Sequence, residues 1–342
     1  MYQREFEKKA RIGLVGVGSH TYRNLLPALH FLPVELVAMT SRGQEKLQKT
    51  AAEYGCRTYA TAKEMYENEQ LDGVVISVSP QMHTQLALEA LSYGVNVFLE
   101  KPPAMYASQI EEMMAARGDK IVSVGFKKAF TPAACKARET IASEQFGSLQ
   151  SVLGIYPMTL PENGPEVLRS GEFTNWLGNG VHPLSMMLSC VGPLKRICAH
   201  RVAGGQGLVA MEFANGVFGN LHLAQEPSPI ESYHFYGGKW RLSIDNTDQI
   251  TLDRGIPFEY AYTNNFAPEG FDSGSIVWRP QNCLATLENK SLFLQGMVQE
   301  MAEFVFAILE GKDPQYSSLE FALQVMRAYE AVLMSQGNWV EL

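Results

Sequence analysis

A lysine that follows a short apolar run is the first candidate for chemistry in this sequence. The run over residues 94–99 has the composition of a buried strand, and Glu100-Lys101-Pro102-Pro103 follows it directly. Open α/β sheets keep their ligands at the carboxyl ends of such strands. This placement makes Lys101 a candidate cation for catalysis, although Glu-Lys-Pro also occurs as an ordinary solvent-exposed turn.

A glycine loop near the start of the chain has the pattern of a nucleotide-binding turn. Gly13-Leu14-Val15-Gly16-Val17-Gly18-Ser19-His20 lies between an apolar run and a predicted helix. In that context Gly16 permits a tight turn, Gly18 lets the backbone approach a pyrophosphate, and helix amides from about Ser19 attract the anion. The third position of the fingerprint is Thr21 rather than Gly or Ala, which predicts looser packing of helix on strand. A structural turn without a ligand is the alternative.

The residues after the second apolar run bear on the choice of dinucleotide. That run ends in Ala38-Met39-Thr40-Ser41-Arg42. An NAD site normally has Asp or Glu here to accept both ribose hydroxyls, whereas a nearby Arg suits the 2′-phosphate of NADP. Ser41 and Arg42 therefore favour NADP(H) over NAD(H), unless Arg42 is only a solvent-exposed surface charge.

The first part of the chain has the pattern of an α/β fold. Between Arg11 and about Lys128, short runs rich in Val, Ile and Leu alternate with amphipathic segments, as in a parallel sheet buried on both faces. We therefore predict a doubly wound, NAD(P)-binding Rossmann domain over residues 1–128. Its predicted strands cover residues 12–15, 34–39, 73–77, 95–99 and 121–124.

Residues 129–342 are predicted to form an α+β domain with a large open, mostly antiparallel sheet. After a helix over residues 133–142, apolar and polar residues alternate, and Asn215-Gly216 is a strong hairpin signal. Residues 157–171 are predicted to be a loop. Two closing helices, 291–310 with Gly311 as a stop signal and 318–335, could pack back on the first domain. The candidate strands cover residues 149–156, 195–202, 207–213, 217–224, 232–236, 239–244 and 249–252.

Composition and charge exclude several classes of protein. The 342 residues are 46% apolar and 19% charged, which is typical of a soluble globular protein of about two domains. A net charge of −8 argues against nonspecific nucleic-acid binding, which needs a basic face. No run approaches the roughly 18 apolar residues that cross a bilayer, and the charged start lacks a signal-peptide core. We therefore expect a cytoplasmic protein with neither nucleic acid nor membrane as a partner.

The cysteines and the remaining histidines give no metal or disulfide pattern. The five cysteines are scattered without a Cys-x-x-Cys pair, which predicts buried free thiols: Cys56, Cys135, Cys190, Cys198 and Cys283. Several histidines show no ligand spacing with acids or cysteines: His20, His30, His200, His222 and His234. No metal site is predicted.

Taken in order, three motifs give the chain a family resemblance. The glycine loop, Val78-Ser79-Pro80-Gln81-Met82-His83 and Glu100-Lys101-Pro102 resemble the Gfo/Idh/MocA oxidoreductase family, as do residues 124–132 and the closing segments 300–314 and 317–322. Members of that family bind a nicotinamide cofactor on the first domain and a sugar, cyclitol or similar polyol against the second sheet. The resemblance implies an NAD(P)-dependent dehydrogenase or reductase that forms a homodimer or homotetramer.

The resemblance also implies which residues contact the cofactor and perform the chemistry. Lys101 would lie beside the nicotinamide and hydrogen-bond the oxygen of the carbon that exchanges hydride. His182, at the family's Gly-x-His position, would take or return the hydroxyl proton from a helix start. The implied cofactor-binding residues are Gly16, Gly18, Ser19, His20, Ser41, Arg42, Ser79, Pro80, His83, Glu100 and Lys101.

The substrate residues are predicted from the same alignment of motifs. Trp176 could stack on a sugar ring, although a core aromatic is equally consistent with its position. Lys127 and Lys128 could meet a phosphate or carboxylate on the substrate. The predicted substrate-binding residues are Lys127, Lys128, Tyr156, Asn175, Trp176 and His182, with Glu162 and Arg169 nearby in sequence.

The chain departs from the family pattern close to the histidine. Gly178 stands where family dehydrogenases usually have Asp, and Ser185 replaces a further acidic residue. Asn179 could orient the imidazole but supplies no charge. The departure leaves open a catalytically weak or inactive NAD(P)-binding sensor of the same fold, or a reductase of a non-sugar carbonyl in which Lys101 acts mainly by charge.

Overall fold

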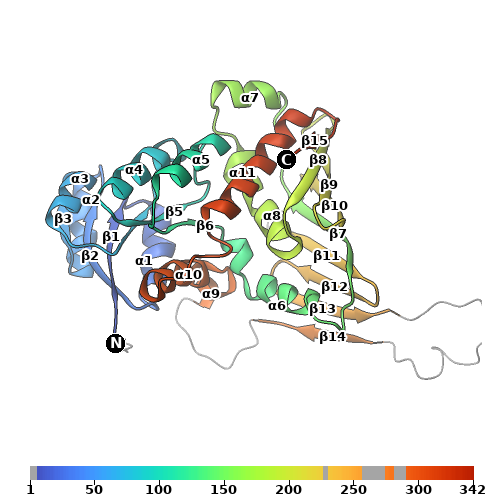
Figure 1. Cartoon of the computed structure of the whole chain (residues 1–342), viewed down its shortest axis with the longest axis horizontal. Coiled ribbons are helices and arrows are strands. Elements are labelled where there is room, and N and C mark those ends of the chain that lie inside the picture. Colours follow the sequence, from blue (N-terminus) through green and yellow to red (C-terminus); the bar gives the residue numbers. More distant parts are fainter. Residues whose placement is uncertain (1–5, 226–229, 256–273, 281–289) are drawn as a thin grey trace, which may run out of the picture. The chain divides into compact units, whose positions relative to one another are not determined.

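The computed structural model describes residues 6–225, 230–255, 274–280 and 290–342, which divide into two compact units (Figure 1). The first unit contains residues 6–130 and 290–327, and the second contains the described residues between 131 and 280 together with 328–342. The expected boundary after residue 128 lies close to this division. The helix α11 (Leu319–Ser335) contributes residues to both units.

The first unit is built on a six-stranded parallel sheet with the order β3-β2-β1-β4-β5-β6. This order reverses between β1 and β4, which is the arrangement of a doubly wound fold and confirms the predicted α/β class. Ligands bind such sheets outside the carboxyl ends of the strands, at the point of reversal. The strands are β1 (Ala10–Val15), β2 (Val34–Thr40), β3 (Arg57–Tyr59), β4 (Gly73–Ile76), β5 (Asn96–Glu100) and β6 (Val122–Gly125).

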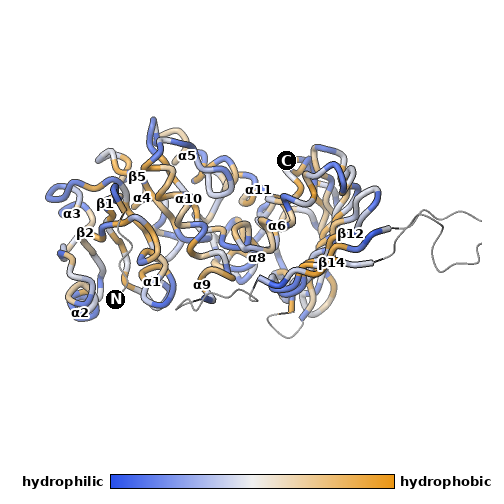
Figure 2. The backbone as a smooth tube through the Cα atoms, turned by 90° about the horizontal axis from the view of Figure 1, so that it is seen from below, coloured by the Kyte–Doolittle hydropathy of each residue, from blue (hydrophilic) through white to orange (hydrophobic). Residues whose placement is uncertain are grey.

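Apolar side chains on the strands and on two helices share one core. Leu14 and Phe98 from the sheet pack in the same buried cluster as Met301 and Phe304 from α10 (Met297–Glu310). Figure 2 shows β1 and β5 as largely hydrophobic, as expected for strands covered on both faces. The other helices of this unit are η1 (Thr21–Leu25), α1 (Leu26–Leu29), α2 (Gln44–Tyr54), α3 (Ala62–Asn68), α4 (Pro80–Ser92), α5 (Ala107–Ala116), η2 (Lys127–Phe130) and α9 (Lys290–Leu294).

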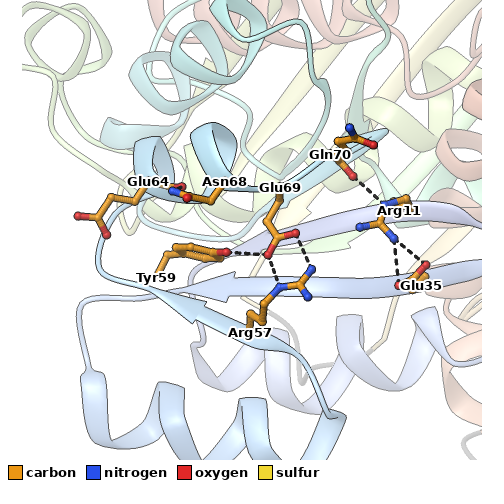
Figure 3. Close-up of polar contacts among 8 residues, drawn as sticks. All are labelled: Arg11, Glu35, Arg57, Tyr59, Glu64, Asn68, Glu69 and Gln70. Atoms are coloured by element: carbon orange, nitrogen blue, oxygen red, sulfur yellow. Dashed lines mark hydrogen bonds and ion pairs between the residues drawn. The ribbon is translucent and has the colours of Figure 1, made fainter.

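Polar contacts hold the edge strand β3, which the sequence pattern did not predict (Figure 3). The Arg57 guanidinium binds the Glu69 carboxylate, and the Tyr59 hydroxyl donates to the same group at 2.7 Å. The hydrogen bond from Arg57 lowers the pKa of the Glu69 carboxyl. A similar contact joins β1 to β2, where Arg11 donates to Glu35 at 3.0 Å. The edge strand therefore depends on ion pairs rather than on an apolar run.

The second unit is built on a nine-stranded sheet with the order β14-β13-β12-β11-β7-β10-β9-β8-β15. Its strands pair in antiparallel fashion except for β10 and β7, which run parallel. The predicted mostly antiparallel sheet is confirmed. The strands are β7 (Leu149–Pro157), β8 (Leu194–Arg201), β9 (Gly207–Phe213), β10 (Phe218–Ala224), β11 (Ser232–Gly237), β12 (Trp240–Asp245), β13 (Gln249–Arg254), β14 (Ser275–Trp278) and β15 (Val340–Glu341).

The hairpin between β9 and β10 follows its sequence signal. Gly216 has a φ of +85°, a backbone conformation that glycine adopts without strain. Asn215 accepts a hydrogen bond of 3.1 Å from the amide of Val217 through its side-chain oxygen. The Asn-Gly dipeptide therefore fixes this turn as predicted.

Two helical predictions were wrong. The expected loop over residues 157–171 contains α7 (Gly164–Ser170), because the Asn163 side chain accepts a hydrogen bond from the Glu166 amide and caps the helix. The expected single helix over 291–310 is interrupted between α9 and α10, where Gly296 has a φ of +81°. Gly311 ends α10 in the left-handed conformation, as predicted.

The cysteines do not all match the expectation of buried thiols. Cys198 is buried, Cys56 and Cys190 are partly buried, and Cys135 is exposed on α6 (Pro132–Ile141). Cys135 lies on the outward face of that helix, where its sulfur is 3.4 Å from the Arg138 guanidinium. Cys283 lies outside the described residues.

Candidate active site

A cavity of about 670 Å³ lies at the carboxyl ends of β1, β2 and β4. This is the point at which the strand order reverses, so it is where a doubly wound sheet binds its ligand. The cavity brings together seven of the residues predicted to bind the cofactor: Gly16, Gly18, Ser19, His20, Ser41, Arg42 and Ser79.

The two glycines of the loop differ in whether a side chain could be accommodated at their position. Gly16 has a φ of +98°, and a Cβ atom there would lie 2.2 Å from the Ser77 carbonyl oxygen, so no side chain fits. A Cβ on Gly18 would meet nothing within 4 Å, which leaves this side of the loop open. Thr21 is fully buried, and its hydroxyl donates to the Gly16 carbonyl at 2.9 Å. The threonine therefore braces the turn, a role that the sequence fingerprint did not predict.

Two cations line the part of the cavity next to β2. Arg42 is exposed, and no ion pair joins it to any residue that the structure describes. Lys46, in the first turn of α2, also lines the cavity and was not predicted. Its signal was a second basic residue shortly after Arg42. Ser41 accepts a hydrogen bond of 3.3 Å from the Val17 amide, which ties the end of β2 to the glycine loop.

Glu100 connects the glycine loop to Lys101. The buried Glu100 carboxylate lies 2.9 Å from Nε2 of His20, and its other oxygen accepts from the Lys101 amide at 3.1 Å. The side-chain amide nitrogen of Asn24 lies 3.0 Å from the second ring nitrogen of His20. Because that amide donates to Nδ1, the ring proton sits on Nε2 and is donated to Glu100.

His83 braces the turn that follows Lys101. It lies in the first turns of α4 as predicted, is fully buried, and donates from Nδ1 to the Pro102 carbonyl at 2.9 Å. Burial lowers the pKa of the imidazole, so the ring is neutral. Pro80 begins α4, and neither Pro80 nor His83 lines the cavity. His83 therefore acts on the turn rather than on the space beside it.

Two lysines of the first unit have lowered pKa values because they are partly buried. Burial lowers the pKa of Lys101, and the negative charge of Glu100 opposes this effect. Burial and the neighbouring charge of Lys128 lower the pKa of Lys127, whose ammonium donates to Gln295 at 3.1 Å. Lys127, predicted to bind substrate, is therefore bound to the segment between α9 and α10.

A buried carboxyl group that the sequence analysis missed acts on both lysines. Glu300, in the first turn of α10, is fully buried, and neither of its carboxyl oxygens has a hydrogen-bond partner in the part of the chain that the structure describes. Burial, followed by the charge of Glu100, raises the pKa of this carboxyl far above its usual range. The signal in the sequence was an acid within the apolar stripe of a helix, between Met297 and Phe304.

His182 lies in the middle of a helix, so the prediction of a helix start was wrong. The helix α8 (Asn175–Val191) begins earlier because the Thr174 hydroxyl accepts from the Leu177 amide at 3.4 Å and caps it. His182 is 5% exposed. Pro183 is accommodated inside the helix, and Ser185 donates to the His182 carbonyl at 3.0 Å. Ser185 thus serves the helix backbone where an acid was expected.

An aromatic ring covers the position at which the family pattern has an acid. A Cβ atom on Gly178 would lie 3.1 Å from the ring of Phe173, which is itself 48% exposed. Positions 178 and 182 are four residues apart on α8 and so lie on one face of the helix. The missing carboxylate is therefore accompanied by an exposed ring above the same helix face as His182.

Trp176 belongs to the core, so its predicted stacking on a sugar ring was wrong. Its ring is fully buried, and the indole nitrogen donates to the Tyr329 carbonyl at 3.2 Å. Asn175 is exposed and accepts from Asn179 at 2.5 Å. Tyr156 is partly buried on β7, where burial and Glu231 raise the pKa of its hydroxyl.

The lesser candidates lie at the surface or carry out local roles. Glu162 is exposed, and the Arg169 guanidinium binds Glu166 one turn earlier on α7. Lys128 follows Lys127 in the short helix η2. Within the described ranges, no three His, Cys, Asp or Glu side chains are grouped so that they could hold a metal ion. No helix in those ranges is long and apolar enough to cross a membrane.

Comparisons with known proteins agree with this geometry. D-xylose 1-dehydrogenase (NADP(+)) 2 of Haloferax volcanii is 25% identical to the chain, covering 96% of it and 99% of the relative. The 4-carboxy-2-hydroxymuconate-6-semialdehyde dehydrogenase of a Sphingobium species is 28% identical, covering 96% and 100%. The crystal structure of a dehydrogenase from Chromobacterium violaceum superposes with a TM-score of 0.81 at 22% identity, covering 96% and 95%, and so shares the fold.

A family model also matches the part of the chain that lines the cavity. The model of the Gfo/Idh/MocA oxidoreductases, described as an oxidoreductase family with an NAD-binding Rossmann fold, matches residues 10–126. That range holds the glycine loop, both cations beside β2 and Lys101. Over residues 10–126 the chain therefore matches the Gfo/Idh/MocA oxidoreductase family.

Proposed function

We propose that the protein is an NADP(H)-dependent oxidoreductase that transfers hydride between the nicotinamide and a carbon that carries a hydroxyl or keto oxygen. The observation that carries this proposal is the cavity at the sheet reversal, which the His20–Glu100 hydrogen bond connects to Lys101. In the proposal the first unit binds the cofactor and the second binds the substrate, a sugar, cyclitol or related compound.

The glycine loop has the space that a dinucleotide needs. Gly16 makes the turn that no other residue could make without a clash, and the open side of Gly18 leaves its backbone accessible to a pyrophosphate. The cavity of about 670 Å³ is in the range of cofactor sites. When bound, the nicotinamide supplies the carbon that accepts or donates the hydride.

The preference for NADP(H) rests on charge beside β2. Arg42 and Lys46 line the cavity, and none of the described residues that line it is an acid. Two cations suit a 2′-phosphate, whereas an NAD site uses a carboxylate to bind the ribose hydroxyls. The relative from Haloferax volcanii, whose name includes NADP(+), supports the same preference.

Lys101 is proposed to polarise the substrate oxygen. Its ammonium can donate a hydrogen bond to an alkoxide or ketone oxygen and so stabilise the charge that develops during hydride transfer. Burial favours the neutral amine, but the adjacent Glu100 carboxylate favours the ammonium. Glu100, held by His20, would therefore keep the lysine charged and oriented.

His182 is proposed to exchange the hydroxyl proton of the substrate. A neutral imidazole can take that proton during oxidation and return it during reduction. Tyr156 and the exposed Asn175 carry polar groups that could bind substrate hydroxyls. Lys127 and Lys128 would suit an acidic group, and the Sphingobium relative is named for a carboxylated semialdehyde.

A second candidate function is favoured by the region around Gly178. Phe173 covers the position of the expected acid, which would leave His182 without a carboxylate to raise its basicity. A protein of this kind could bind NADP(H) as a sensor with little turnover. The sensor and the enzyme predict different outcomes in one experiment.

The test is a panel of aldoses, inositols, their keto forms and carboxylated aldehydes, assayed by NADPH absorbance with NADP+ or NADPH. Turnover of any member at a rate above the Lys101→Met variant supports the enzyme. A rise in melting temperature with NADP+, but no turnover across the panel, supports the sensor. Lack of binding to either dinucleotide contradicts both.

We also propose, from the family resemblance, a cytoplasmic homodimer or homotetramer. Phe218, on β10, and Trp339, just before β15, are exposed and in edge-to-face contact, and this apolar surface could be covered by another copy. Sedimentation of the purified protein at several concentrations tests the oligomeric state. A monomer at every concentration would contradict it.

A further inference from the structure

Glu300 is buried where an apolar residue would be expected. It has no exposed surface, and neither carboxyl oxygen has a hydrogen-bond partner among the residues that the structure describes. Its neighbours at helical spacing on α10 are Met297 and Phe304, which are both buried. A buried polar group without partners lowers the free energy of unfolding, so a methionine here would pack better. The position therefore calls for an explanation other than stability.

The carboxyl group of Glu300 lies near the carboxyl group of Glu100. An oxygen of each lies 3.4 Å from the point that a Cβ atom on Gly125 would occupy, so the two oxygens are at most twice that distance apart. Glycine at position 125, the last residue of β6, leaves the space between them open. Two carboxyl groups this close do not both ionise readily, because the second negative charge is repelled by the first.

The groups around this pair are those of the proposed reaction. The helix α10 packs against η2, α1, α9, β1, β5 and β6. The charged side chains from those elements and the adjoining turn that act on Glu300 are Glu100 at the end of β5, Lys127 in η2 and Lys101. No other part of α10 brings an acid to these two lysines in the described structure.

We propose that Glu300 is a positioning residue for Lys101: its buried carboxyl group lies near that of Glu100, and the ionisation of Glu300 sets the charge beside the lysine ammonium. This inference deepens the proposed function, because it depends on the proposed role of Lys101. Burial and the charge of Glu100 raise the pKa of the Glu300 carboxyl, so Glu300 keeps its proton at pH values at which an exposed glutamate has lost it. When Glu300 loses this proton at higher pH, the second negative charge holds the proton on Lys101.

The pair therefore protects the lysine against alkaline loss of its proton. Burial favours the neutral amine of Lys101, whereas the charges of Glu100 and Glu300 favour the ammonium. Removing the Glu300 carboxyl removes one of the two opposing charges. The alkaline limb of activity, which reports the loss of the ammonium, then moves to lower pH.

The experiment compares Glu300→Met and Glu300→Gln with the wild type and with Gln299→Met. Gln299 is the matched control, because it lies in the same turn and has a buried oxygen without a partner, but it carries no charge. The first measurement is the melting temperature of the cofactor-free protein from pH 5 to pH 8. The second is the pH dependence of kcat with saturating NADP+ and substrate.

In the expected result Glu300→Met melts above the wild type, and the difference grows as the pH rises. The reason is that the folded protein holds a proton that the unfolded chain has lost above about pH 4.3. The alkaline limb of kcat moves to lower pH by about one unit in both Glu300 variants, which is about tenfold in activity at a fixed alkaline pH. Gln299→Met leaves the limb in place.

A melting difference that does not change with pH, or an alkaline limb that stays in place in both Glu300 variants, overturns the inference. If Glu300→Met does not fold, Glu300→Gln preserves the shape of the side chain and decides alone. Failure of the proposed function is distinguished by Lys101→Met. If that variant keeps wild-type turnover, the role of Lys101 fails and the inference fails with it. If it is inactive while the Glu300 profiles are unchanged, only the inference fails.

Discussion

His20 and Glu100 are joined by a hydrogen bond of 2.9 Å that links the glycine loop to the residue preceding Lys101. The two residues lie on different elements: His20 follows the loop at the end of β1, and Glu100 ends β5. A change at the nucleotide loop is therefore transmitted to the turn that holds the lysine. We expect both cofactor binding and turnover to depend on this hydrogen bond.

The contact itself can be measured with a double-mutant cycle. His20→Ala and Glu100→Gln should each weaken NADP+ binding, and the double variant should weaken it by less than the two effects combined. Interaction energies of residues in direct contact are typically about 0.5–3 kcal/mol. The dissociation constants for NADP+ that the cycle requires can be measured by quenching of tryptophan fluorescence. Strictly additive effects would mean that the hydrogen bond carries no coupling.

Arg42 is predicted to select NADP(H). Arg42→Ala should raise the Kd for NADP+ about tenfold, because a hydrogen bond to a charged group contributes roughly 1.5–3 kcal/mol and tenfold is about 1.4 kcal/mol. The Kd for NAD+ should change little. Lys49→Ala is the control, since Lys49 lies on α2 shortly after Arg42 but pairs with Glu45 and does not line the cavity. An equal loss for both dinucleotides would argue against contact with a 2′-phosphate.

The two loop glycines should respond differently to alanine. Gly16→Ala should destabilise the cofactor-free protein, because a positive φ in a residue other than glycine costs about 1–3 kcal/mol and the Cβ atom would clash with Ser77. Gly18→Ala should leave that stability unchanged but weaken NADP+ binding, since its Cβ atom would enter open space. Denaturant unfolding and cofactor titration separate the two effects. Normal cofactor binding by Gly18→Ala would contradict the proposed pyrophosphate site.

The edge strand β3 gives a prediction about pH and stability. Arg57 lowers the pKa of Glu69, so the folded carboxyl stays ionised at pH values at which the unfolded one takes up a proton. The stabilisation is present above the unfolded pKa and is lost as the pH falls through the folded pKa. Arg57→Met should therefore lower the free energy of unfolding more at pH 7 than at pH 4. An equal loss of unfolding free energy at pH 7 and pH 4 would mean that Arg57 acts through packing rather than through its charge.

Restoring the missing acid tests the region around His182. Gly178→Asp alone should fail to raise turnover, because its side chain would meet the Phe173 ring. The double variant Gly178→Asp with Phe173→Ala should raise kcat by about tenfold or more, since general acid–base assistance is commonly about 10²–10⁴-fold. Phe173→Ala alone is the control. No gain in the double variant would mean that His182 does not limit the reaction.

Much of the fold could be predicted because local patterns set it. Residues 12–15 of β1 and the whole of β4 are continuous apolar runs, as burial on both faces requires, and Asn215-Gly216 fixes one hairpin. The strand β3 was missed because ion pairs, rather than apolar residues, hold it at the edge of the sheet. Gly296 was read as part of a helix, since a single glycine does not reveal its φ in the sequence.

The part of the candidate site formed by the glycine loop could be predicted, because the backbone conformation of such a loop restricts the residue types. Gly16 and Gly18 were found from spacing because a turn that admits a pyrophosphate constrains both positions. The sequence could not decide between a core and a substrate role for Trp176, since its indole binds Tyr329, far away in the sequence. Glu300 was missed for a similar reason: the charged groups that act on it, Glu100 and Lys101, lie about 200 residues before it.

In the proposed mechanism Lys101 acts on the substrate oxygen and is not needed to hold the cofactor. The most direct measurement is NADP+ binding and turnover by Lys101→Met, on whichever compound of the panel the wild type converts. The Kd for NADP+ should stay within about threefold of wild type, while kcat should fall by about 10²–10³, as for loss of one oxyanion donor. Turnover near the wild-type rate with intact cofactor binding would contradict the claim.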